Sequence, residues 1–393
     1  MARTPQTRLI HEGSQRSHYG ETAEPIYLTS GFVYDSAEQA EARFRGDEGE
    51  QGKFIYSRYG NPSIQVFEER LRLLEGAQAC VATGSGMSAM AASLLCYLRA
   101  GDHVVASTVL FSSCLQILQT YLPRFGIDVT LVDGADLKAW EAAIRPGKTK
   151  VFFCETPANP TLALVDIAAV ANIAHGVAAL MIVDNAFACP IVQKPLDLGA
   201  DVVTYSATKH MDGQGRCMGG AVLCAEEFYR DHLQPYHRHM GPHMSPFNAW
   251  SLAKSLETLD LRVTRMCENA LQIAQTLEKS PRIRRVLYPG LKSHPQYDLA
   301  QRQMQSGGSL LAFEVEGGKQ EAFALLNHLK LILISNNLGD SKSLATHPAT
   351  TTHQTLGEDG RAAAHISDAL IRLSVGLENS EDLIADLLTA CRF

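Results

Sequence analysis

The chain lacks the features that mark several large classes of protein. Its 393 residues contain no long run of Lys or Arg and carry a net charge of -7, so no basic surface for nucleic acid or for an anionic membrane is indicated. The most apolar segment, VAALMIV at 177–183, is far too short to cross a bilayer, and the first residues show no apolar signal-peptide core. We therefore expect a cytoplasmic protein that binds neither nucleic acid nor membrane.

The cysteines are spaced in a way that excludes the common cysteine sites. They number nine, and none forms a CxxC pair or a Cys/His pair with the spacing of a zinc site. Most of them lie within apolar segments. We therefore expect reduced thiols in the core and no bound metal.

Composition divides the chain into three parts. Residues 1–62 are polar and interrupted by Gly and Pro, which predicts an N-terminal arm. In residues 63–257, strand-like apolar runs alternate with helical patterns, which predicts a large α/β domain with a mostly parallel central sheet. Residues 258–393 begin with a long helical pattern and continue with mixed strands and helices, which predicts a smaller α/β domain.

Periodicity places the individual elements. In the large domain the predicted strands are 103–107, 128–132, 150–154, 179–184, 201–206 and 220–224, and the predicted helices are 63–75, one starting at Ser85, 112–122 and 166–176. In the small domain we expect strands near 283–288, 309–315, 331–335 and 370–375, and a closing helix after Asn379.

Ligands of open parallel sheets bind beyond the carboxyl ends of the strands, so the loops there are the first place to look for a site. The segment ATGSGMSAM (82–90) puts small residues at the start of a helix, where the N–H groups of Gly86 and Met87 could bind a phosphate. An ordinary N-cap by Ser85 explains the same residues equally well. The segment has neither the GK[ST] of a Walker A loop nor the GxGxxG of a dinucleotide site.

Two other strand ends carry side chains suited to an aromatic cofactor. Asp184 ends the apolar strand before NAFACP, and a partly buried carboxylate there needs a positive partner such as a protonated ring nitrogen. Taken alone, Asp184 could equally cap its own turn. Asn159 in CETPANP precedes a proline and has an amide free to donate a hydrogen bond, although alone it only marks a turn.

The segment TYSATKHMDGQGRCMGG (204–220) delivers one lysine, Lys209, from a strand into a glycine-rich loop, with Ser206 and Thr208 just before it. A lone lysine is most often a solvated surface residue. In combination with the anion site, Asp184 and Asn159, however, it predicts a site for pyridoxal 5′-phosphate (PLP). Lys209 would bond to the aldehyde, its amine made reactive by a lowered pKa, and Asp184 would keep the ring nitrogen protonated.

Seven blocks in this chain resemble the Cys/Met-metabolism family of PLP-dependent enzymes. They are YSRYGNP (56–62), GSGMSA (84–89), ETPANP (155–160), VDNAFACP (183–190), SATKHMDGQG (206–215), SKSLATHPATTTH (341–353) and IRLSVGLE (371–378). The resemblance spans nearly the whole chain. It implies a fold type I PLP transferase similar to aspartate aminotransferase, whose arm reaches the active site of a neighbouring subunit. It also implies a dimer that is usually doubled to a homotetramer.

The resemblance further implies roles for individual residues. Lys209 would be the catalytic lysine that holds PLP. The other implied cofactor contacts are Gly86, Met87, Ser206 and Thr208 at the phosphate, Tyr56 and Arg58 at the phosphate of a neighbouring subunit, Asp184 at the ring nitrogen, Asn159 at the phenolic oxygen and Phe111 on the ring face. Many members have a tyrosine at the stacking position, so Phe111 keeps the stacking and loses the phenolic hydroxyl.

The implied substrate contacts are Arg372 at the α-carboxylate, Asn337, and Arg216 at a succinyl carboxylate. A structural arginine is the alternative interpretation for Arg372, and a solvated loop arginine is the alternative for Arg216.

Within the family, NLGDSKSLATHPATTTH (337–353) is similar to the sulfhydrylases, and KHMDGQGRCMGG (209–220) to the branch that uses O-succinylhomoserine. The implied reaction replaces succinate by sulfide at Cγ and gives homocysteine for methionine biosynthesis. The alternatives are cystathionine γ-synthase, O-acetylhomoserine sulfhydrylase and, more remotely, a methionine or cystathionine γ-lyase. A non-catalytic PLP-binding regulator is the alternative from outside enzymology.

Overall fold

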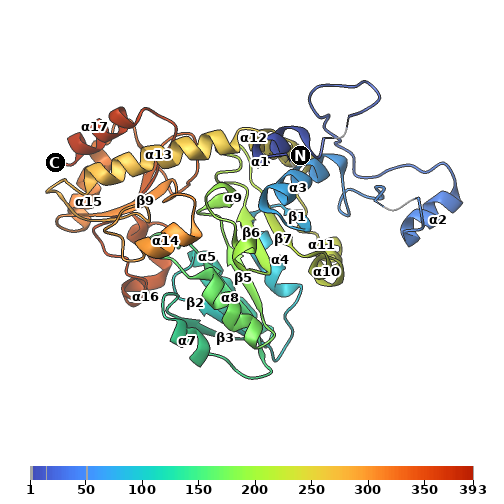
Figure 1. The fold of residues 1–393 in the computed structure, drawn as a ribbon, viewed down its shortest axis with the longest axis horizontal. Coiled ribbons are helices and arrows are strands. Elements are labelled where there is room, and N and C mark those ends of the chain that lie inside the picture. The colour runs from blue at the N-terminus through green and yellow to red at the C-terminus, as the bar shows by residue number, and fades with distance from the viewer. Residues whose placement is uncertain (1–2, 15, 50–51, 393) are drawn as a thin grey trace.

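Two β-sheets organise the chain in the computed structural model, which describes residues 3–14, 16–49 and 52–392 (Figure 1). The large sheet has the strand order β1-β7-β6-β5-β4-β2-β3. Its strands are β1 (Ala79–Thr83), β2 (His103–Ser107), β3 (Asp128–Val132), β4 (Thr149–Glu155), β5 (Leu180–Asp184), β6 (Val202–Ser206) and β7 (Gly220–Cys224). The strands β3, β2, β4, β5 and β6 pair in parallel, and β7 is antiparallel to both β6 and β1. The predicted mostly parallel sheet is confirmed.

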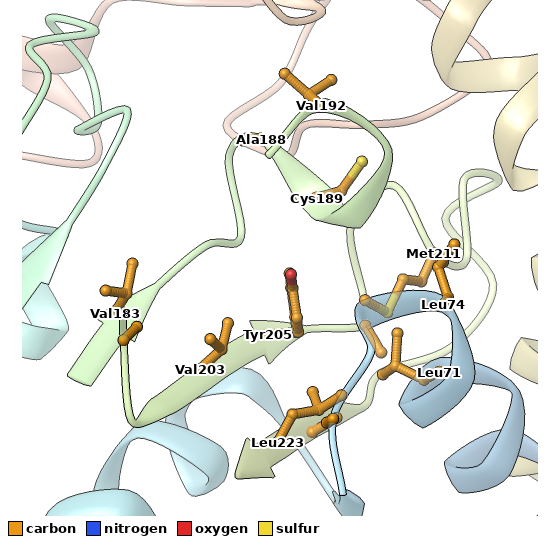
Figure 2. Close-up of a cluster of buried hydrophobic side chains, with 14 of the residues drawn as sticks. Leu71, Leu74, Val183, Ala188, Cys189, Val192, Val203, Tyr205, Met211 and Leu223 are labelled. Carbon is orange, nitrogen blue, oxygen red and sulfur yellow. The ribbon is translucent and has the colours of Figure 1, made fainter. Parts of the chain in front are cut away.

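The central strands are apolar on both faces because helices cover both sides of the sheet. In β4, Phe152 and Cys154 join one buried cluster and Val151 and Phe153 join another. This alternation follows from the period of two along a strand. Figure 2 shows part of the first cluster, where Tyr205 of β6 packs among side chains of α3 and α9.

The helices associated with the large sheet connect its strands or lie beside it. They are α1 (Pro5–His11), α2 (Ala37–Arg45), α3 (Pro62–Glu75), α4 (Gly86–Leu95), α5 (Ser112–Gln116), α6 (Leu122–Arg124), α7 (Leu137–Ala142), α8 (Ile167–Gly176), α9 (Cys189–Val192), α10 (Glu226–Phe228), α11 (Gln234–Met240) and α12 (Pro246–Leu256). No helix in the described part of the chain is both long enough and apolar enough to cross a membrane.

The C-terminal part holds the smaller sheet, with the order β10-β11-β12-β9-β8. Its strands are β8 (Ile283–Leu287), β9 (Leu310–Val315), β10 (Leu333–Ile334), β11 (Leu344–Thr346) and β12 (Leu370–Ser374). Its helices are α13 (Leu259–Leu277), α14 (Tyr297–Gln303), α15 (Lys319–His328), α16 (Gly357–Ala363) and α17 (Ser380–Ala390), which Asn379 caps as expected for the closing helix. The smaller α/β unit is confirmed, whereas the exact cuts at residues 62 and 257 stay predictions. Side chains of α13 and α14 also join the core of the large sheet, so packing crosses residue 257.

The structure contains elements that the sequence patterns did not predict. Two strands, β1 and β11, were missed, and so were α1 and α2 within the arm. Leu9 of α1 is 1% exposed and belongs to the core of the large sheet. The beginning of the expected arm is therefore packed on the body of the protein.

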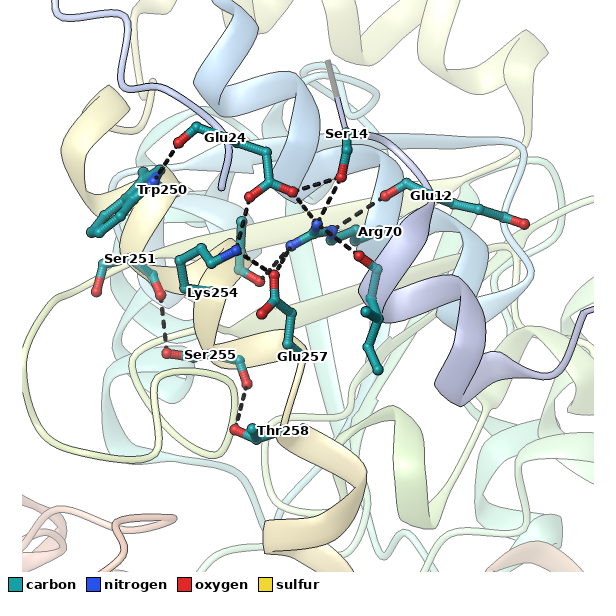
Figure 3. Close-up of polar contacts among 12 residues, drawn as sticks. Glu12, Ser14, Glu24, Arg70, Trp250, Ser251, Lys254, Ser255, Glu257 and Thr258 are labelled. Atoms are coloured by element: carbon teal, nitrogen blue, oxygen red, sulfur yellow. Dashed lines mark hydrogen bonds and ion pairs between the residues drawn. The ribbon is translucent and has the colours of Figure 1, made fainter. Parts of the chain in front are cut away.

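A buried arginine fastens this N-terminal segment to the body (Figure 3). Arg70 of α3 is 1% exposed and pairs with Glu24 and with Glu257, the latter at 3.1 Å. It also donates to the Glu12 carbonyl at 3.2 Å and to Ser14 Oγ at 3.0 Å. The guanidinium thus ties residues on both sides of position 15 to α3 and to the end of α12.

One part of the arm projects from the body of the protein, and hydrogen bonds hold the two ends of this part close together. The Tyr27 N–H donates to Ser63 Oγ at 2.9 Å, Asn61 Nδ2 donates to the Tyr27 carbonyl at 2.9 Å, and the Ser57 N–H donates to the Ser30 carbonyl at 2.9 Å. Between these contacts, the segment that carries α2 extends away from both sheets (Figure 1). We call residues 28–49 and 52–57 the projecting segment. Its apolar side chains include Val33 at 92% exposure.

Replacing Arg70 by Met should destabilise the fold, because Glu24 keeps only Lys254 as a cationic partner and the carbonyl groups that Arg70 serves lose their donor. We expect the apparent free energy of unfolding in urea to fall by about 3–5 kcal/mol. The matched control is Arg45→Met, whose ion pair with Glu41 is exposed and should contribute little. Equal losses in the two variants would contradict the role assigned to Arg70.

Candidate active site

Three neighbouring strands of the large sheet end in polar side chains at one edge. β4 ends at Glu155, β5 at Asp184 and β6 at Ser206. The strands are parallel, and Glu155 lies opposite Asp184 in the register. Because neighbouring strands are roughly 4.8 Å apart, these strand ends form one site beyond the sheet edge.

Lys209 lies in the turn after β6, with its side chain partly buried. Its N–H donates to the Ser206 carbonyl at 3.2 Å, and its carbonyl accepts from the Gly213 N–H at 2.8 Å. Its Nζ donates to Asn337 Oδ1 at 2.7 Å. Burial and then the charge of Arg372 lower the pKa of Lys209 to about 8. A useful fraction of the amine is therefore neutral near neutral pH, as a reactive lysine requires.

A close backbone contact brings the C-terminal part of the chain to this lysine. Gly339 has a φ of 71°, and a Cβ there would lie 2.6 Å from the backbone N of His210. A side chain would strain the left-handed backbone and collide with the main chain, so the position needs glycine. The contact holds Asn337, two residues earlier, beside the amine of Lys209.

Arg372 reaches the site from β12 of the small sheet. It is 1% exposed, and Nη1 donates to Asn159 Oδ1 at 3.0 Å. Nη2 donates to the carbonyls of Asn336 at 2.9 Å and Asn337 at 3.1 Å. Burial lowers the pKa of Arg372 to about 10, so the group is charged at neutral pH. Its Nε is buried and has no hydrogen-bond partner within the described residues, which leaves a charged donor for a carboxylate ligand.

Asp184 is a carboxyl group that lacks a cation. Its Oδ1 accepts from the Ala186 N–H at 3.0 Å, which is the turn-capping contact considered from the sequence. Burial raises the pKa of Asp184, and no cationic side chain of the described residues counters this. The site therefore favours a ligand that places a positive charge at Asp184.

Glu155 is a site residue that sequence reasoning did not select. It is 3% exposed, and its carboxyl accepts from the N–H of Phe111 at 2.6 Å and of Asn159 at 3.0 Å. Burial and then the charge of Asp184 raise its pKa. The signal was present in the sequence, because Glu155 ends the apolar run KVFFCE just as Asp184 ends LMIVD.

The predicted phosphate site is a close approach between α4 and the end of β6. A Cβ at Gly86 would lie 2.6 Å from the Cβ of Ser206, so only glycine allows this approach. Ser85 caps α4, and its side chain accepts from the Ser88 N–H at 3.1 Å. The capping interpretation is therefore correct, and it leaves the N–H groups of Gly86 and Met87 at the helix start, where an anion would be favoured.

Phe111 and Thr208 lie on the loops around these strand ends. Phe111 is partly buried at the start of α5. Its ring has no polar atom, so it can offer a ligand only stacking. The Thr208 hydroxyl exchanges hydrogen bonds with the main chain of Gly219 at 3.1 and 3.2 Å, which closes the glycine-rich loop.

Tyr56 and Arg58 contact other parts of the arm and α11 in their own chain. The Tyr56 side chain is 42% exposed and meets the Tyr59 ring edge-on. Arg58 donates to the carbonyl of Arg238 and lies 4.9 Å from the centre of the Tyr59 ring. Their predicted role at a neighbouring subunit stays a prediction.

Arg216 is held by its own loop. Its Nε donates to Asp212 Oδ1 at 3.1 Å, and Nη2 donates to Ser255 Oγ. The Asp212 side chain is fully buried, so this ion pair supports the loop after Lys209. A bond from Arg216 to a succinyl carboxylate would compete with the ion pair, and it stays a prediction.

The thiols and acidic side chains that the structure describes can be examined for a metal site. All nine cysteines are free, as expected. No group of three or more His, Cys, Asp or Glu side chains that could hold a metal ion occurs in the described ranges.

Comparisons with known proteins agree on one family. The family model described as Cys/Met metabolism PLP-dependent enzyme matches residues 6–392. An O-succinylhomoserine sulfhydrylase of Mycobacterium tuberculosis (strain CDC 1551 / Oshkosh) is 52% identical over 96% of this chain and 93% of its own length. An L-methionine gamma-lyase of Porphyromonas gingivalis is 44% identical over 97% of this chain and 95% of its own.

A solved structure extends the likeness to the fold. A Campylobacter jejuni protein described as an O-acetylhomoserine (thiol)-lyase superposes with a TM-score of 0.93 at 32% identity, and the match covers 99% of this chain and 100% of that one. That structure contains N′-pyridoxyl-lysine-5′-monophosphate.

Replacing Arg372 by Gln should raise the pKa of Lys209, because the change removes a positive charge that disfavours the ammonium form. The pKa can be read from the pH dependence of the rate at which an amine-directed acylating reagent labels Lys209, with the labelled peptide measured by mass spectrometry. In the unchanged protein, freed of bound small molecules, we expect a midpoint near 8. Arg216→Gln is the control and should leave the midpoint in place. Identical midpoints for Arg372→Gln and the unchanged protein would refute the electrostatic link.

Proposed function

Because this chain belongs to the family of Cys/Met metabolism PLP-dependent enzymes, we propose that it replaces the succinyl group of O-succinylhomoserine by sulfide, giving homocysteine and succinate. Its fold is that of the fold type I PLP enzymes, and its cofactor is PLP. The observation that carries the choice of reaction is the 52% identity, over 96% of the chain, to a protein named for that reaction.

The residues at the strand ends fit PLP. Gly86 allows the start of α4 to lie against Ser206, where its N–H groups could bind a phosphate, and no cation of the described residues serves Asp184, so a pyridinium nitrogen would provide one. The free Nε of Arg372 is suited to the carboxylate of an amino-acid substrate. When bound, PLP supplies an aldehyde that holds an amine and a ring that withdraws electrons from the substrate.

Lys209 would hold the cofactor before the substrate arrives and would then act as the base. Its neutral Nζ would accept the proton from Cα, release it, and, neutral again, accept the proton from Cβ, so that succinate leaves Cγ. It would return the protons after sulfide has bonded to Cγ. The hydrogen bond from Nζ to Asn337 would hold the amine in one orientation during these proton transfers.

Asn159 and Phe111 would orient the cofactor ring. Because Asn159 Oδ1 accepts from Arg372, the side-chain NH₂ group remains free to donate to the phenolic oxygen of PLP. Phe111 would stack on the ring without adding an acid or a base. Proton transfer would then fall to Lys209, since Phe111 lacks the hydroxyl of a tyrosine.

A γ-lyase is the second candidate, and the 44% identity to an L-methionine gamma-lyase favours it. A lyase would release ammonia and a 2-oxo acid from its substrate without an added thiol. An O-acetylhomoserine sulfhydrylase and a cystathionine γ-synthase would use the same residues with a different acyl group or nucleophile. These candidates differ in products, so a product assay separates them.

The purified holoenzyme should convert O-succinylhomoserine and sulfide to homocysteine and succinate, measured by chromatography of both products. We expect this reaction to exceed those of the acetyl ester with sulfide, of the succinyl ester with cysteine, and of methionine alone. Lys209→Ala should reduce turnover by at least ~10²–10⁴-fold, since it removes the base and the attachment point. Ammonia and 2-oxobutyrate as the main products would contradict the proposal in favour of the lyase.

We further propose that two copies of the chain share their active sites, with the projecting segment of one reaching the other. The exposed Tyr56 side chain and the exposed apolar side chains of the projecting segment support this arrangement. Arg58 and Tyr56 would then meet the PLP phosphate of the partner copy. A homotetramer built as a dimer of dimers, and a cytoplasmic location, are further predictions of the same kind.

Sharing can be tested by mixing inactive subunits. Lys209→Ala and Arg58→Ala homo-oligomers should each have low activity. Co-expression should restore about a quarter of the native sites, because about half of the dimers are mixed and each mixed dimer keeps one intact site of two. Co-expression of Lys209→Ala with Arg372→Ala is the control. Both of those residues serve the site of their own chain, so no intact site forms. Absence of recovery in the first mixture would show that Arg58 does not act across subunits.

A further inference from the structure

Glu155 occupies a position where a charged side chain is costly. It is 3% exposed at the end of β4, and it lies opposite Asp184 in the register with β5. Burial and the neighbouring carboxyl of Asp184 raise its pKa, and the N–H groups of Phe111 and Asn159, followed by the charge of Arg372, oppose them. A buried carboxyl beside a second carboxyl reduces stability unless specific contacts compensate. The contacts of Glu155 therefore indicate what the residue is for.

Each oxygen of Glu155 holds the main chain of a different loop. Oε2 accepts from the Phe111 N–H at 2.6 Å, where α5 begins after β2. Oε1 accepts from the Asn159 N–H at 3.0 Å, in the turn after β4. Phe111 and Asn159 are the two residues proposed to touch the face and the phenolic oxygen of the PLP ring. One carboxyl group thus fixes the backbone of both, and it stands beside Asp184, the proposed partner of the ring nitrogen.

We propose that Glu155 is a positioning residue for the PLP ring: it sets the places of Phe111 and Asn159 relative to one another, beside Asp184. Asp184 is held by the pairing of β5, whereas Phe111 and Asn159 lie on loops that follow β2 and β4. A single group that joins these two loops fixes the tilt of the ring more tightly than two separate loops would.

A purely structural role is the alternative interpretation. A buried carboxyl that accepts two N–H bonds could simply satisfy main-chain donors and stabilise the loops with or without a cofactor. That role would change stability and leave the geometry of bound PLP unaltered. The two interpretations therefore differ in the optical properties of the cofactor.

The test is Glu155→Gln, which keeps the shape but turns one hydrogen-bond acceptor into a donor that faces an N–H group. We expect the dissociation constant for PLP to rise by about 10- to 100-fold, the effect of leaving a buried N–H group without its acceptor. We also expect the visible circular dichroism of bound PLP, measured per mole of cofactor on saturated holoenzyme, to fall clearly, because the ring is no longer held in one tilt.

Glu75→Gln is the matched control. Glu75 is also fully buried, and burial raises its pKa to about 8, but it accepts from the Tyr205 hydroxyl at 2.6 Å and from no proposed ring contact. We expect this variant to lower the unfolding temperature as much as Glu155→Gln does and to keep the visible circular dichroism unchanged. Glu155→Asp is the second variant. It retains the charge but is one methylene too short to reach both loops, so it should resemble Glu155→Gln.

The inference rests on the proposed placement of PLP at Lys209, and the outcomes keep the two apart. Borohydride reduction of the unchanged holoenzyme should label Lys209, and a failure there would overturn the placement itself. With Lys209 labelled, unaltered PLP affinity and circular dichroism in Glu155→Gln would overturn only the role of Glu155. If neither Glu155 variant yields folded protein, the carboxyl is needed for folding and the positioning role is refuted.

Discussion

The hydrogen bond between the Arg372 guanidinium and the Asn159 side chain joins the two sheets at the active site. Arg372 belongs to the small sheet, and Asn159 belongs to the turn after β4 of the large one. The same guanidinium donates hydrogen bonds to the carbonyls of Asn336 and Asn337. The side chain of Asn337 in turn accepts a hydrogen bond from the amine of Lys209. Any shift of one sheet against the other would change these distances together, so the substrate-facing and cofactor-facing residues move as one set.

Burial disfavours the charged form of every titratable group of the site that is named above. The pKa values of Lys209 and Arg372 are lowered and those of Asp184 and Glu155 are raised, each mainly by burial. Such an arrangement is unfavourable for folding by itself, and the apolar cores on both faces of the large sheet and in the small domain offset it. A phosphate, a pyridinium and a carboxylate would supply the missing partners. Binding of such groups would therefore offset part of this electrostatic cost.

Sequence patterns identified the parts of the fold that local periodicity determines. Strands such as 103–107 and 128–132 were predicted within their observed bounds because each is a run of apolar and β-branched residues. β1, with the sequence ACVAT, was missed because alanine and cysteine give little strand preference. Its conformation depends on pairing with β7, which lies far away in the sequence. Likewise, α1 is defined by packing on α3 rather than by its own pattern.

Residues of the candidate site could be selected from the sequence where they lie in a distinctive local motif. They were harder to select where their role depends on partners that are far away in the sequence. The segment around Lys209 was enough to select that residue. Glu155 ends an apolar run just as Asp184 does, but its two N–H partners, like the Asp212 partner of Arg216, became apparent only from the structure.

The projecting segment shows a further effect of contacts between residues far apart in the sequence. Because residues 27–30 and 57–61 are bonded to each other, the segment is a closed loop whose ends are already joined. Folding has therefore already removed much of the conformational entropy of the projecting segment. Because docking on another molecule would cost correspondingly less entropy, even a modest contact area can hold the segment in place.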